Sequence, residues 1–66
     1  MAKDSLKTGT RYWFWSGYRV RSGLYGGETD PDNGNVIICE KNGTRWSIPA
    51  EDLYKREEDV VKSRKG

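Results

Sequence analysis

The side chains best suited to chemistry in this 66-residue chain are arginines and aromatic residues, because the usual catalytic types are nearly absent. The chain has no His and one Cys, so neither a Ser–His–Asp nor a Cys–His arrangement can be assembled, and a His/Cys metal cluster cannot be built. No glycine-rich loop has the Walker spacing that cradles phosphate. We therefore expect a protein that is not an enzyme and that needs no metal or other cofactor.

Two further candidates for chemistry are better explained as structure. The acidic run at residues 30–34 suggests a calcium loop, but the Gly and Glu positions that such a loop requires hold Asn35 and Lys41. A turn explains the run better, since Asp, Pro, Asn and Gly are all turn formers. Cys39 is predicted to lie in the core opposite Trp46, where a thiol acts as a small hydrophobic group rather than a reactive one.

The richest candidate for a binding site is the stretch 11–25, which combines aromatic and arginine side chains. A period of two places Tyr12 and Phe14 on one face of a strand and Trp13 and Trp15 on the other. We expect the arginines of the following strand to lie on the same face as the two tryptophans. The predicted binding residues are Arg11, Trp13, Trp15, Arg19, Arg21 and Tyr25.

Exposed aromatic rings beside arginines suit three kinds of ligand. They stack on nucleic-acid bases, with about 1–3 kcal/mol for each stacked base. They also form the hot spots of protein–protein interfaces, and they build cages for methylated Lys or Arg. The structural alternative is that Trp13 and Trp15 only cover the end of the fold or the C-terminal segment.

Charge is distributed unevenly, although the net charge of the chain is only +2. Residues 1–25 carry a net charge of +4, whereas residues 26–34 and 51–59 each carry −3. This polarity favours a partner bound in one orientation, and an ordinary solvated surface is the alternative. The modest net charge argues against strong non-specific binding to DNA.

The stretch 34–53 is predicted to organise the fold, because two β-rich runs flank Asn42-Gly43. This dipeptide favours a two-residue type I′ turn, which would set Glu40 opposite Arg45. Successive side chains then point to opposite faces. The predicted core face carries Ile37, Cys39, Trp46 and Ile48. The predicted outer face carries Val36, Ile38, Glu40, Arg45 and Ser47.

The remaining segments are predicted around this hairpin. A first strand runs from Gly9 to Trp15, and a second runs from residue 18 to 25 with a bulge or sharp bend at Gly23. Residues 49–53 read as a 3₁₀ turn before a short last strand around Tyr54. The competing interpretation is one helix over residues 49–62.

Both ends of the chain are polar. Residues 1–7 are predicted to be disordered. Residues 57–66 form a charged tail that can hold a short helix, in which Glu58 and Lys62 would pair. The chain shows no internal repeat and no second domain.

The motifs along the chain carry a resemblance to a known fold. They are Gly9-x-x-Tyr12-Trp13-Phe14, Val20-x-x-Gly23, Val36-Ile37-Ile38, Asn42-Gly43 and Trp46-x-Ile48-Pro49-Ala50-Glu51-Asp52-Leu53. This layout resembles small SH3-like β-barrels, including Tudor-type, KOW-type and similar bacterial and phage domains. The resemblance covers residues 8–56. It implies an all-β fold, a small antiparallel barrel of about five strands with a 3₁₀ turn before the last strand.

The resemblance implies no particular ligand, because this fold hosts many unrelated ones. A eukaryotic peptide-binding SH3 domain is disfavoured, since its usual Ala-Leu-Tyr-Asp-Tyr start and its Trp-Trp pair are missing. We expect a non-catalytic binding or adaptor module whose first partner is nucleic acid. The alternative is a protein partner, bound on the same aromatic face as a cage or inhibitor-type contact, or on the acidic loop 28–32. With no long apolar run and no apolar leader, we expect no membrane contact and a cytoplasmic location.

Overall fold

A computed structural model, which describes residues 3–65, shows a four-stranded antiparallel sheet with one short helix. The strands lie in the order β1 (Arg11–Trp15), β2 (Val20–Thr29), β3 (Val36–Cys39) and β4 (Arg45–Ile48). The 3₁₀ turns η1 (Lys3–Ser5) and η2 (Ala50–Asp52) lie before β1 and after β4, and helix α1 (Glu57–Lys65) follows. The fold is therefore predominantly β, as predicted.

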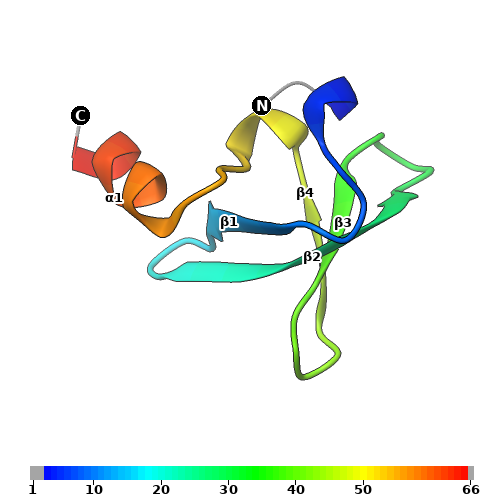
Figure 1. Cartoon of the computed structure of the whole chain (residues 1–66), viewed down its shortest axis with the longest axis horizontal. Helices are drawn as coiled ribbons and strands as arrows, with labels where there is room; N and C mark the ends of the chain where they lie inside the picture. Colours follow the sequence, from blue (N-terminus) through cyan, green and yellow to red (C-terminus); the bar gives the residue numbers. More distant parts are fainter. Residues whose placement is uncertain (1–2, 66) are drawn as a thin grey trace.

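Strand β2 joins two hairpins that run in different directions. Its first half pairs with β1 from Trp15↔Val20 to Arg11↔Leu24, and its second half pairs with β3 from Leu24↔Cys39 onward. In Figure 1, β1 and β2 lie across the view while β3 and β4 stand steeply against them.

Gly23 lies where β2 passes from one hairpin to the other. A Cβ on Gly23 would lie 2.5 Å from the carbonyl oxygen of Cys39, so no larger residue fits at this close approach. The irregular register of β2 lies further along the strand, between Tyr25 and Thr29. A bulge or sharp bend was predicted at Gly23; the structure instead shows a close approach there, and the irregular register comes later in the strand.

The core lies on one face of the sheet. Its buried side chains are Tyr12, Phe14, Tyr25, Val36, Ile38 and Leu53. Phe14 packs against Trp46 with ring centroids 5.6 Å apart, and Tyr12 meets Tyr25 edge-on at 6.4 Å. The inward position predicted for Tyr12 and Phe14 is confirmed. Full burial of a large apolar side chain such as Phe14 contributes about 1.5–3 kcal/mol to the stability of the fold.

The predicted faces of the β3–β4 hairpin are wrong in part, because the register differs by one residue. Cys39 lies opposite Arg45, and the Glu40 amide donates to the Thr44 carbonyl at 2.8 Å. Three residues form the loop, and Gly43 alone among them takes a positive φ, of 95°. This is a type I turn closed by a left-handed glycine, not a type I′ turn.

A one-residue change of register moves every side chain of a strand to the opposite face. Val36 and Ile38 are consequently buried, although they were predicted to face outward. Cys39 is exposed and Ile37 is half-buried, whereas both were predicted to lie on the core face. Trp46 and Ile48 pack against the core, as predicted.

The predicted closed barrel of five strands is not what the structure shows. Within residues 3–65 the sheet has four strands, and the last strand is reduced to a single bridge between Trp13 and Tyr54. The 3₁₀ turn η2 precedes this bridge, as in the first of the two predicted arrangements. The competing helix over residues 49–62 is wrong, since α1 begins only at Glu57.

The two ends of the chain carry short helical segments. Turn η1 lies within the segment 1–7 that was predicted to be disordered, and residues 1–2 of that segment lie outside the described residues. Helix α1 occupies most of the predicted tail, of which residue 66 is not described, and buries Val60. Glu58 pairs with Arg56 instead of Lys62. No helix within residues 3–65 is long and apolar enough to cross a membrane.

Candidate functional site

The strongest candidate site is a shallow groove of about 350 Å³ between β2 and the tip of the β3–β4 hairpin, which we call the basic groove. Its charged lining residues are Arg11, Arg19, Arg21, Lys41 and Glu40, and they surround Trp13. Val20, Ser22 and Asn42 complete the lining. Four basic side chains against one acidic side chain give this surface a net charge of +3.

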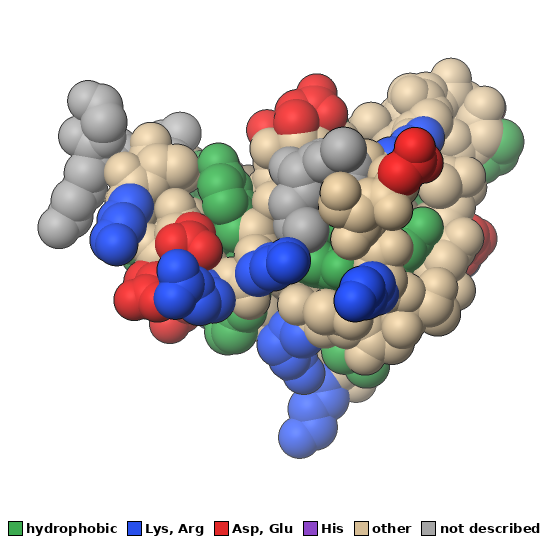
Figure 2. Space-filling model, turned by 45° about the horizontal axis from the view of Figure 1, so that its top comes forward, with side chains coloured by type: hydrophobic (Ala, Val, Ile, Leu, Met, Phe, Trp, Pro, Cys, Tyr) green, Lys and Arg blue, Asp and Glu red, His purple; other side chains and the backbone are tan. Residues whose placement is uncertain are grey.

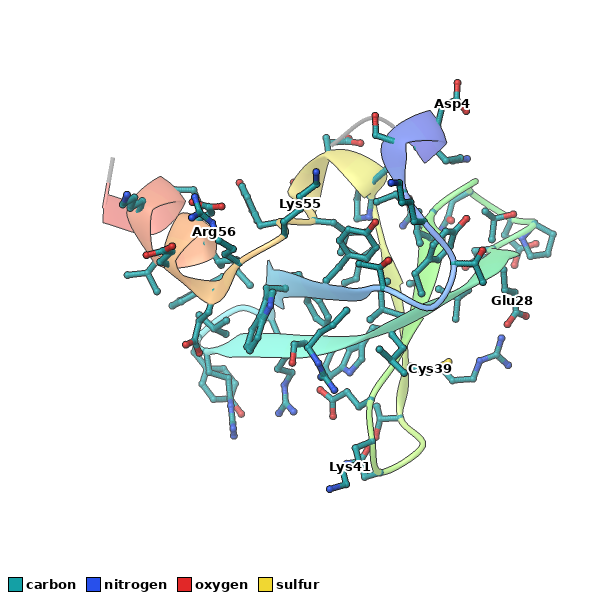
Figure 3. The ribbon with its side chains drawn as sticks, viewed as in Figure 1. Asp4, Glu28, Cys39, Lys41, Lys55 and Arg56 are labelled. Atoms are coloured by element: carbon teal, nitrogen blue, oxygen red, sulfur yellow. The ribbon has the colours of Figure 1, made fainter. Side chains whose placement is uncertain are left out.

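The groove exists because β2 and β3 pair over only part of their length. Within residues 3–65 their ladder begins at Leu24↔Cys39, so the edge of β2 that faces away from β1 is unpaired over residues 20–23. The hairpin tip diverges from this edge, and the space between them is the groove. Figure 3 shows Lys41 at that tip.

Two backbone hydrogen bonds to Tyr54 fix the position of Trp13. Its N–H donates to the Tyr54 carbonyl at 2.8 Å, and its carbonyl accepts from the Tyr54 N–H at 2.9 Å. The peptide groups of Trp13 thus point away from β2, and those of its partner Ser22 point away from β1, toward the groove.

The half-buried Trp13 side chain lines two hollows at once. One is the basic groove, and the other is a hollow of about 420 Å³ that it shares with Lys55, Arg56, Glu57 and Glu58. Lys55 and Arg56 lie on the segment between η2 and α1 (Figure 3). The indole therefore borders basic side chains in both hollows, and in the second hollow Glu57 and Glu58 balance the charges of Lys55 and Arg56.

Three of the four cations in the basic groove keep an uncompensated charge. Arg11 donates to the neutral Ser22 hydroxyl at 3.1 Å. The exposed Arg19 and Lys41 side chains have no ion-pair partner in the part of the chain that the structure describes. An anionic ligand could approach these three groups without displacing a carboxylate.

Arg21 differs from the other groove cations because protein groups already hold it. It pairs with Glu40 at 3.3 Å, donates to the Ser16 hydroxyl at 3.2 Å and lies over the Trp46 ring at 5.1 Å. Only 25% of its side chain is exposed. Arg21 thus fastens β2 to the β3–β4 hairpin, and its charge is largely offset by Glu40.

The position predicted for Arg21, on the same face as Trp13 and Trp15, is wrong. The turn sets Trp15 opposite Val20, and Arg21 therefore lies opposite Phe14. Directly opposed residues of an antiparallel pair share a face. Arg21 consequently lies on the inner face of the sheet, where it reaches Trp46.

Two other predicted site residues lie elsewhere. Tyr25 was predicted to be exposed, but it is 9% exposed and packs in the core against Tyr12. Its position follows from its pairing with the buried Ile38. Trp15 is half-buried, donates to the Gly17 carbonyl at 2.8 Å and lines a separate hollow with Asp52, Tyr54 and Ser63.

The structure therefore brings together Arg11, Trp13, Arg19 and Arg21 from the predicted set and adds residues that the sequence analysis missed. The added residues are Glu40, Lys41, Asn42 and Lys55. Lys41 directly precedes the Asn-Gly turn, so its exposure at a hairpin tip was readable from the sequence. Its approach to β2 was not, because that depends on where the β2–β3 ladder stops.

The basic side chains outside the basic groove include two compensated arginines. The pKa of Arg45 is raised, first by a hydrogen bond to Glu28 and then by the charge of that carboxylate. The pKa of Arg56 is raised by Asp59, through a hydrogen bond and its charge, and by Glu58. In Figure 2, Lys and Arg side chains spread across the middle and lower parts of the molecule, with the acidic groups mainly above and to the left.

Comparison with known proteins gives no family for this chain. It matches no protein-family model, no curated protein and no solved structure. Function therefore has to be inferred from the basic groove itself.

Proposed function

We propose that this protein is a non-catalytic binding domain that holds nucleic acid in the basic groove. The observation that supports it best is the grouping of uncompensated cations around one half-buried tryptophan. Phosphate oxygens would pair with Arg11, Arg19 and Lys41, and a base would stack on Trp13. Glu40 does not oppose this binding strongly, because Arg21 already accompanies it.

The SH3-like barrel belongs to the same proposal. Three features support it: the bent β2 shared by two hairpins, the 3₁₀ turn after β4, and the bridge from Tyr54 to β1 where a last strand would run. In this interpretation the fifth strand is shortened to one residue pair. The shortening leaves Lys55 directly after the bridge and beside Trp13.

An amide NMR titration with short single-stranded and duplex oligonucleotides tests the nucleic-acid function. Shifts should concentrate on Arg11, Trp13, Arg19, Ser22 and Lys41. Three neutralised phosphates would make the logarithm of affinity fall with the logarithm of salt concentration with a slope of about −2 for a single strand. A folded sample that shows no shifts at low salt would contradict the proposal.

Charge reversal provides the matched control. Arg19→Glu combined with Lys41→Glu should abolish binding, since both groups are exposed and uncompensated. Arg45→Glu combined with Lys62→Glu changes the net charge equally, but both residues are exposed and lie outside the basic groove and outside the hollow beside Lys55. If the two double variants lose affinity equally, binding reflects overall charge and not the groove.

A protein partner is the second candidate, and the unpaired edge of β2 favours it. An extended peptide could add a strand along residues 20–23. Tyr18 and Leu24 flank this edge and are 80% and 46% exposed. Such a contact would depend little on salt, whereas phosphate binding weakens steeply as salt rises.

A further inference from the structure

We infer that the ligand of the basic groove is single-stranded, and that one strand crosses Trp13 from the basic groove to the hollow beside Lys55. This inference rests on the proposed nucleic-acid function and adds the class of ligand and its path. The observation behind it is that a single tryptophan lines both hollows.

Uncompensated cations line both of the hollows that Trp13 borders. Arg11, Arg19 and Lys41 line the basic groove. Lys55 lines the other hollow and has no ion-pair partner among the described residues. These groups can follow the phosphates of one strand that passes over the indole.

Stacking on Trp13 selects against a closed duplex. Bases inside a duplex are already stacked and paired, so a side chain can stack on one only when it is splayed out. The indole borders an uncompensated cation in each of its two hollows, which suits a base whose two flanking phosphates continue in opposite directions.

The β2 edge next to Trp13 supplies neutral hydrogen-bonding groups. The N–H and carbonyl of Ser22 point into the basic groove, away from β1. One donor and one acceptor beside a stacking ring can pair with the Watson–Crick edge of an unpaired base. Such an edge is accessible in a single strand and is occupied by the opposite base in a duplex.

Acidic groups bound the path beyond Lys55. Glu57 and Glu58 line the same hollow, and Arg56 is held by Glu58 and Asp59. A duplex presents two rows of phosphates, of which the second would meet these carboxylates. A single strand can follow the uncompensated cations and turn away after Lys55.

Fluorescence polarisation with a labelled run of about eight deoxythymidines, compared with a duplex of matched length, tests the inference. The single strand should bind at least about tenfold more tightly. Its salt slope should be about −3, because Lys55 adds a fourth contact. Intrinsic tryptophan fluorescence should be quenched on binding, since a base stacks on an indole.

Variants identify the path. Trp13→Ala should weaken single-strand binding by about 5- to 100-fold, and Trp13→Phe should retain most of it while removing the quench. Trp15→Phe is the control and should keep both affinity and quench. Lys55→Ala should reduce the salt slope by about 0.7, whereas Lys62→Ala on the exposed face of α1 should not.

The possible outcomes separate the two proposals. Tighter single-strand binding that depends on Trp13 and Lys55 supports the inference. Equal or tighter binding of the duplex, or a Trp13→Phe variant that keeps the full quench, overturns it while the nucleic-acid function stands. If folded protein binds neither probe at low salt, the proposed function fails and the inference fails with it.

Discussion

Strands β1 and β3 both pair with β2, yet only one of them presents the faces that its sequence suggests. In β1 the alternation of Tyr12 and Phe14 with Trp13 places the first two in the core. In β3 the buried residues are Val36 and Ile38, the reverse of the prediction. The two strands have similar lengths and lie in the same sheet, so the difference has a local cause.

The cause is the residue pattern of each strand, which distinguishes the two faces in β1 but not in β3. Strand β1 begins with an exposed Arg11, and its opposite face has only aromatic rings without full charges. Strand β3 has four apolar residues in a row, so nothing in its composition distinguishes one face from the other. Its faces are set by the turn, where three residues form the loop instead of two.

The largest expected effect comes from the glycine that lets β2 serve both strands. Gly23→Ala should destabilise the fold by about 3 kcal/mol or more, because the new Cβ would meet the Cys39 carbonyl. In a domain of this size that loss should leave little folded protein. Urea unfolding followed by tryptophan fluorescence measures it.

Gly26→Ala is the matched control, since a Cβ there meets nothing within 4 Å and the residue has no positive φ. It should be close to neutral. If the two alanines cost the same, the close approach between β2 and β3 is not as described.

The next effect tests the faces of β3 directly. Ile38→Ala should cost about 2–5 kcal/mol, because Ile38 is fully buried, whereas Ile37→Ala should cost about 1 kcal/mol or less. In the register of a type I′ turn, Ile37 would be buried and Ile38 exposed, so Ile37→Ala would be the more costly substitution. Thermal unfolding of the two variants therefore distinguishes the registers.

A smaller effect is expected at the turn. Gly43→Ala should cost about 1–2 kcal/mol, because Gly43 has a φ of 95°. Asn42→Ala should cost about 0.5–1 kcal/mol, through loss of the hydrogen bond from the Thr44 N–H to the Asn42 side chain. Equal and large losses at both positions would indicate positive φ at both, as in a type I′ turn; chemical denaturation of each variant gives the numbers.

The smallest effect is expected at Cys39. Cys39→Ser should change the free energy of unfolding by no more than about 0.5 kcal/mol, because the side chain is exposed. In the native protein a thiol reagent should modify Cys39 nearly as fast as in urea. If the thiol reacts only after unfolding, Cys39 lies in the core, as the sequence suggested, and not on the surface.

Much of the fold could be read from the sequence because turns and aromatic patterns are local signals. The position of the Asn-Gly turn, the strand at β1 and the 3₁₀ turn after Pro49 are all marked by residue types with local conformational preferences. The sequence did not reveal the register between strands or the faces that depend on it, because these are set by contacts between segments. The choice between two and three loop residues involves small energies, and one residue reverses a face.

The candidate site was predictable to a similar extent. Arg11, Trp13 and Arg19 were predicted because aromatic rings beside arginines suit a binding face, and all three line the basic groove. Tyr25 and Arg21 were misplaced, since burial and partners depend on register. Lys41 and Lys55 come from distant parts of the chain and line the two hollows at Trp13. Lys41 does so because the β2–β3 ladder stops early, and Lys55 because it follows the single bridge between Trp13 and Tyr54.

The unpaired edge of β2 has a consequence for how copies of this protein meet each other. An open edge of backbone groups is a template for edge-to-edge aggregation, which natural sheets commonly oppose with charge. Here Arg19 and Arg21 lie along the edge and Lys41 faces it. A second copy that docked edge to edge would bring like charges together. The cations that we assign to ligand binding would thus also act as gatekeepers, and a variant that lost them would gain a route to self-association.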